Sequence, residues 1–140
     1  MKSVDGVYTA EDYKRLFDHL QAHYPEMALF WQIGCETGYR VSDLLTLHIK
    51  DIKERQICIV ERKTKRERTA TISEATERLL IRHRNNKMLL PYSLIWSYNR
   101  QQVWRCIRRA GLAVGLPRLG LGHIAHARHM LGSNSYALLL

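Results

Sequence analysis

The sequence is poor in cysteine and proline, with three of each among 140 residues. Cys35, Cys58 and Cys106 are odd in number, lie far apart and form no C-x-x-C pair. This pattern argues against a disulfide framework and against a cysteine-rich zinc site. We therefore expect all three to be buried thiols.

Long hydrophobic runs are also lacking. No apolar stretch approaches the roughly 18 residues that a membrane-spanning helix needs, and the start MKSVDGVYTAEDYKRL lacks the layout of a signal peptide. There is no internal repeat and no Pro- or Gly-rich tract, while 46% of the residues are hydrophobic. The sequence therefore predicts a cytoplasmic globular domain spanning residues 1–140, with no membrane partner.

Acidic residues are scarce relative to basic ones. Thirteen Asp and Glu stand against 22 Lys and Arg, which gives a net charge of +9. Such an excess indicates a polyanionic partner, most often nucleic acid. A basic domain that binds RNA or a protein is the weaker alternative, because no RNA-binding aromatic strand motif is visible.

Hydrophobic periodicity and capping residues predict a mainly helical chain. The expected helices are one capped by Thr9 and Asp12 that runs to about His23, a buried one from Pro25 that ends between Gly34 and Gly38, a short one over 41–47, one capped by Ser73 that fades at Asn85, one capped by Asn99 over 100–113, and a last one over 126–140. In the helix over 100–113, Val103, Trp104 and Ile107 are expected to face inward.

The hydrophobic pattern changes from a helical to a strand-like period in the middle of the chain. Two β-branched runs, 56–60 and 69–72, flank the charged segment 61–68, which predicts an antiparallel hairpin with a charged tip. The expected fold class is therefore α+β, mainly helical with a small antiparallel sheet.

Several segments, in their order along the chain, resemble the motifs of the tyrosine recombinase, or phage integrase, family. Residues 36–47, Glu-Thr-Gly-Tyr-Arg-Val-Ser-Asp-Leu-Leu-Thr-Leu, are similar to its first-arginine motif T-G-x-R-x-S-E/D-L-x-x-L. Residues 49–52 resemble the W-x-D-I element, 63–68 the hairpin K-G-x-K-x-R, 99–115 the helix that precedes the second arginine, and 127–131 the R-H-x-x segment. The resemblance extends from Thr9 to Leu140 and implies the catalytic-domain fold, without the separate N-terminal core-binding domain.

The resemblance implies a role for each motif residue. Arg40 and Arg128 hold the scissile phosphate, Lys63 acts as the general acid, and Asp43 orients Arg40. Two fixed guanidiniums can bind the charge that builds on a phosphate during attack, and a lysine near other cations can give up a proton more readily. The family histidine is expected three residues before the second arginine, where Ala125 stands; His126 is the nominee in its place, with His123 second. His129 matches the residue that follows the arginine.

The family's nucleophilic tyrosine lies well beyond the second arginine, and no segment here matches its motif. Tyr136 is in the wrong position and lies in an apolar run, which favours a packed residue. We expect the nucleophile from a longer reading frame or from a partner subunit.

A metal site at His123, His126 and His129 is disfavoured, because the run begins in a Gly-rich loop and no acidic or thiol ligand adjoins it. The resemblance implies no cofactor.

Double-stranded DNA is the expected partner, and no small-molecule substrate is expected. Arg62, Lys65, Arg66, Arg100 and Arg105 are the candidate phosphate contacts. Two oligomeric states stay open: self-association into a tetramer on DNA, as the resemblance implies because relatives act as tetramers on paired sites, and a monomer. The first hypothesis is a site-specific recombinase that cleaves and rejoins DNA through a 3′-phosphotyrosine on a mobile element; the alternative is a non-catalytic DNA-binding remnant or regulator of recombination or transcription.

Overall fold

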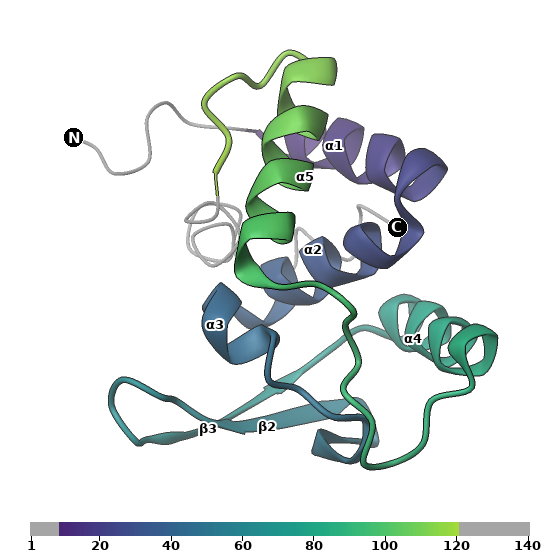
Figure 1. Ribbon diagram of the computed structural model, residues 1–140, viewed down its shortest axis with the longest axis vertical. Helices are drawn as coiled ribbons and strands as arrows, with labels where there is room; N and C mark the ends of the chain where they lie inside the picture. Colours follow the sequence, from purple (N-terminus) through teal and green to yellow (C-terminus); the bar gives the residue numbers. More distant parts are fainter. Residues whose placement is uncertain (1–8, 121–140) are drawn as a thin grey trace.

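The computed structural model describes residues 9–120 (Figure 1). Its elements are α1 (Ala10–His23), α2 (Pro25–Thr37), α3 (Val41–Leu44), the short 3₁₀ helix η1 (Ile49–Asp51), β1 (Ile52–Lys53), β2 (Gln56–Val60), β3 (Glu67–Thr71), α4 (Glu74–Lys87) and α5 (Arg100–Ala113). Helices dominate and one antiparallel sheet lies at one end of the molecule, as predicted. Among the described residues, no helix combines the length and hydropathy needed to cross a membrane.

Helices α1 and α2 form the centre of the core. The Thr9 hydroxyl accepts from the Asp12 N–H, and the Asp12 carboxylate accepts from the Thr9 N–H, so the predicted capping box begins α1. Helix α2 is buried from Met27 to Thr37, and its Trp31 ring stacks on Tyr13 of α1 with centroids 5.4 Å apart. The turn that follows α2 is therefore attached to the most rigidly packed part of the molecule.

The sheet has the strand order β1-β2-β3, with every neighbouring pair antiparallel. Ile57 and Ile59 of β2 face the core, and the register pairs Val60 with Glu67 at the tip end of the hairpin. The second strand runs two residues further toward the tip than predicted. Strand β1 was not predicted, because two residues are too few to show an alternating pattern.

Two predictions of burial are wrong, and a third is met only in part because Cys106 is half-buried. Trp104 is 48% exposed, because the inward stripe of α5 follows Val103, Ile107 and Ala110 and leaves position 104 outside. Cys58 is exposed, because it alternates with the inward-facing Ile57 and Ile59. The predicted helix over 41–47 ends at Leu44, and the predicted last helix over 126–140 lies outside the described residues.

The segment between α4 and α5 packs against α3. The indole Nε1–H of Trp96 donates to the carbonyl of Leu44 at 2.9 Å, and the ring meets Phe30 edge-on and stacks on His83. Backbone bonds from Ile49 to Ser93 and from Ile95 to Leu47 continue this contact. The short α3 is thus fixed at its C-terminal end by residues distant in sequence.

Candidate active site

The predicted phosphate-binding Arg40 lies in the turn between α2 and α3. Gly38 takes a left-handed conformation, with φ of 72°, and ends α2. The Thr37 hydroxyl donates to the Ile33 carbonyl and accepts from the Tyr39 N–H. Tyr39 is buried and Arg40 is exposed, so the extended backbone here turns one side chain inward and the next toward solvent.

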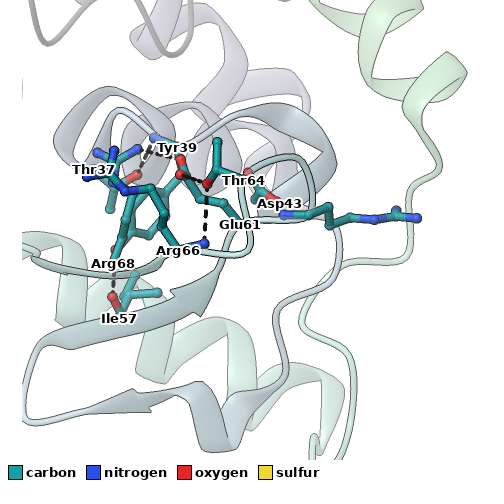
Figure 2. A network of polar contacts seen from close by, with 9 residues as sticks. Thr37, Tyr39, Asp43, Ile57, Glu61, Thr64, Arg66 and Arg68 are labelled. Carbon is teal, nitrogen blue, oxygen red and sulfur yellow. Dashed lines mark hydrogen bonds and ion pairs between the residues drawn. The ribbon is translucent and has the colours of Figure 1, made fainter.

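Tyr39 joins this turn to the hairpin (Figure 2). Its hydroxyl donates to the Ile57 carbonyl of β2 at 2.7 Å, and the Arg68 guanidinium of β3 lies 5.1 Å from the centre of its ring. A cation at this distance from an aromatic face is attracted to it. The residue before Arg40 is therefore held by both long strands of the sheet.

The predicted general acid, Lys63, lies at the hairpin tip and is exposed. The tip is closed by the Glu61 N–H bonding to the Arg66 carbonyl and the Lys65 N–H bonding to the Glu61 carbonyl. Lys65 has a positive φ of 62°, which the tight turn imposes. Lys63 is thus presented to solvent from a loop of defined conformation.

Asp43 of α3 contacts this tip. Its Oδ1 accepts from the backbone N–H of Arg62 at 3.2 Å, and the residue is 3% exposed. The structure thereby brings the arginine motif and the lysine hairpin together, through neighbours of Arg40 and Lys63. That Asp43 orients Arg40 stays a prediction, because the hydrogen bond described for its carboxylate goes to the hairpin.

Glu61 makes contacts at the tip that the sequence did not indicate, since it was predicted only as part of a charged tip. Its carboxylate accepts from the Thr64 hydroxyl at 2.7 Å and from Arg68 at 3.1 Å. Those two hydrogen bonds, with the positive charges of Arg68 and Arg40, hold the pKa of Glu61 below its usual value against the opposing effect of burial. The charge of Arg40 makes the smallest of these contributions to the pKa of Glu61.

The stability of the folded protein should therefore fall in acid as Glu61 becomes protonated. Because the pKa of Glu61 is lowered in the folded state, its stabilising effect is present above the ordinary value of about 4.3 and is lost as the pH falls through the lowered value. Glu61→Gln removes the charge at every pH. We expect the melting temperature of the wild type to exceed that of the variant near neutrality, and the gap to close on acidification. A gap that stays constant down to about pH 3 would contradict this assignment.

Glu36 is a second residue that sequence reasoning missed as a contact. It is buried on α2, and its carboxylate accepts from the Gln32 amide at 2.7 Å, from the Ser73 N–H at 2.7 Å and from the hydroxyls of Ser73 and Thr76. Ser73 caps α4 directly after β3. The one available signal was an acidic residue near the end of a helix that is mostly apolar from Met27 onward.

The remaining predicted site residues fall into two groups. The candidate DNA contacts are exposed: Arg62, Lys65 and Arg66 on the tip, and Arg100 and Arg105 in the first half of α5. The candidates Arg128, His123, His126, His129 and Tyr136 lie outside the described residues. Their placement at the site stays a prediction.

Tyr39 and Tyr98 are poorly placed to act as nucleophiles. Tyr39 is buried with its hydroxyl bonded to a carbonyl, and burial raises the pKa of Tyr98 to about 12. Burial likewise raises the pKa of the Cys35 thiol well above its ordinary value and that of Cys106 to about 11. Within residues 9–120, no three His, Cys, Asp or Glu side chains are grouped as a metal site would need.

Comparison with solved structures identifies the fold class. The chain superposes on XerA recombinase with a TM-score of 0.74 at 18% identity, covering 99% of this chain and 59% of the other. A lambda integrase (75–356) dimer bound to a COC′ core site gives a TM-score of 0.70 at 19% identity, covering 99% of this chain and 61% of the other. The lambda integrase catalytic core gives a TM-score of 0.71 at 16% identity, covering 96% of this chain and 90% of the other. The fold is that of tyrosine recombinase catalytic domains, and the chain spans about three-fifths of the first two proteins.

The family model described as the phage integrase family matches residues 7–136. The chain therefore belongs to the phage integrase family, the group of site-specific recombinases that its motifs resemble. No curated protein sequence gives a significant match.

Proposed function

We propose that this chain binds double-stranded DNA and supplies the phosphate-binding and proton-donating residues of a strand-cleavage reaction. The observation that carries the proposal is the attachment of the Lys63 hairpin to the Arg40 turn. The Tyr39 hydroxyl bonds to Ile57, and Asp43 bonds to the N–H of Arg62. Arg40 and Lys63, which come from separate motifs, thus belong to one connected unit. Both side chains are exposed, so a DNA backbone can reach them.

The chemistry follows from charge development at phosphorus. A tyrosine hydroxyl gives up its proton to a base or to solvent, and its oxygen forms a bond to the scissile phosphate. The bond from phosphorus to the 5′ oxygen breaks, and that oxygen takes a proton. Arg40, together with Arg128, would bind the non-bridging oxygens most strongly in the transition state. Lys63 would deliver the proton.

Neighbouring exposed cations support DNA as the partner. Arg62, Lys65 and Arg66 surround Lys63 on the tip, and the whole chain carries a net charge of +9. Phosphate contacts of this kind fix the position of a protein on the duplex. The similar structures include a lambda integrase dimer on a core site and a tetramer on a Holliday junction, and we propose that this protein also assembles on DNA.

The test uses the protein expressed from its complete reading frame and a duplex that it selects from a random pool. Lys63→Ala should slow cleavage of the ordinary phosphodiester by roughly 100-fold. The same variant should cleave at close to the wild-type rate when sulfur replaces the 5′ bridging oxygen, because a thiol is a much stronger acid than an alcohol and its anion leaves unprotonated. Lys53→Ala, an exposed lysine on β1, is the matched control.

The outcomes separate the candidate functions. Equal loss on both substrates would contradict the general-acid role of Lys63. Salt-dependent binding without cleavage of either substrate would support the non-catalytic DNA-binding alternative. Absence of DNA binding would overturn both.

A further inference from the structure

The hairpin tip departs from the family pattern at two positions, Thr64 and Arg66, and Arg66 stands where the pattern has lysine. Thr64 follows Lys63 where the pattern K-G-x-K-x-R has glycine. The Thr64 hydroxyl donates to Oε1 of Glu61 at 2.7 Å and accepts from the N–H of Arg66 at 3.3 Å (Figure 2). Glycine can make neither contact, so this tip has a side-chain connection that the pattern residue does not provide.

The same glutamate connects the tip to the arginine turn. Its other oxygen, Oε2, accepts from Arg68 at 3.1 Å, and the Arg68 guanidinium lies against the Tyr39 ring. Tyr39 directly precedes Arg40. A continuous set of contacts therefore runs from Thr64, through Glu61 and Arg68, to the backbone that carries Arg40.

Exposure and charge distinguish this set from ordinary packing. Thr64 is exposed and Glu61 is only 8% exposed, so one acidic group is enclosed within a tip whose other side chains are mostly basic and solvated. The Thr64 hydroxyl contributes no apolar burial to the core. Its two hydrogen bonds fix the backbone on the C-terminal side of Lys63, while the Asp43 bond to Arg62 fixes the N-terminal side.

We propose that Glu61 and Thr64 are positioning residues. They hold the Lys63 loop in a fixed position relative to Arg40 before DNA binds. The inference rests on the proposed function, because it concerns proton delivery by Lys63. A loop already ordered in the free protein loses less conformational entropy when the phosphate is bound. Removing the Thr64 hydroxyl keeps Lys63 and the backbone bonds of the tip but removes the side-chain hydrogen bonds to Glu61 and Arg66 that fix the loop.

The test compares Thr64→Val, which has the same shape without the hydroxyl, with Thr64→Ser, which keeps the hydroxyl. We expect Thr64→Val to slow cleavage of the ordinary phosphodiester by about tenfold and that of the bridging-sulfur duplex by less than about twofold. Thr64→Ser should restore the wild-type rate. A purely structural role would slow both substrates equally, and that result would overturn the proposal.

A second measurement needs no cleavage. In the free wild-type protein, the Arg66 amide should exchange slowly with solvent because the Thr64 hydroxyl accepts its hydrogen. The exchange rate of the Arg66 amide should rise at least about tenfold in Thr64→Val and return to the wild-type value in Thr64→Ser. Unchanged exchange would overturn the inference by itself. If the wild type cleaves neither duplex, the proposed function fails and the proton-delivery role fails with it.

Discussion

Replacing Arg40 by alanine should slow DNA strand cleavage roughly 1,000-fold while changing DNA affinity by less than about threefold. The guanidinium is exposed in the turn after α2, and its charge makes the smallest of the contributions to the lowered pKa of Glu61. Its proposed contact to the scissile phosphate strengthens as charge develops there, so its loss affects the transition state most. Affinity depends on many phosphate contacts spread over the surface, of which this is one.

The measurement is single-turnover cleavage beside binding to the same duplex, with the protein from the complete reading frame. Arg78→Ala removes an exposed arginine from α4, on a different element, and should leave the cleavage rate unchanged. Parallel loss of cleavage and affinity in Arg40→Ala would show that Arg40 serves general DNA binding. Wild-type cleavage by Arg40→Ala would remove it from the site altogether.

Replacing Trp96 by alanine should lower the free energy of unfolding by about 3–5 kcal/mol. Trp96 is 4% exposed, its ring packs on Phe30 and His83, and its Nε1–H donates to the Leu44 carbonyl at the end of α3. Truncation opens a cavity and removes one of two donors of the Leu44 carbonyl, which keeps the N–H of Leu47. The four-residue α3, which carries Asp43, depends on this contact for its position.

Trp96→Phe separates the two effects. It keeps most of the ring packing and removes the hydrogen bond, so the loss should fall to about 1–2 kcal/mol. Urea unfolding of both variants gives the two values. A Trp96→Ala loss below about 1 kcal/mol would contradict the structural role assigned to this side chain.

Elements with local signals were predictable from the sequence. The Thr9 and Asp12 capping box, the Asn99 cap and Gly38 at the end of α2 each act within a few residues, so their contacts can be read from spacing alone. The arginine turn and the lysine hairpin were identified through motif resemblance, and the structure places their neighbours in contact.

Long-range contacts were not predictable in the same way. Glu36 bonds to Ser73 and Thr76 across 37 and 40 positions, and Glu61 bonds to Arg68 within a segment whose charges looked uniformly solvated. No periodicity marks a carboxylate that is buried because a distant helix N-terminus needs acceptors. Trp104 was wrongly assigned to the inward face of its helix, whereas the stripe of Val103, Ile107 and Ala110 leaves it 48% exposed.

The most direct test of the central claim is whether the protein from the complete reading frame becomes covalently joined to DNA. The selected duplex carries a nick beside the cleavage point, so that a released fragment diffuses away and the intermediate accumulates. We expect a detergent-stable adduct in which mass spectrometry finds a tyrosine linked to a 3′ phosphate, strongly reduced by Arg40→Ala. Salt-dependent binding to the same duplex with no adduct from the wild type would contradict a cleavage function and leave DNA binding alone.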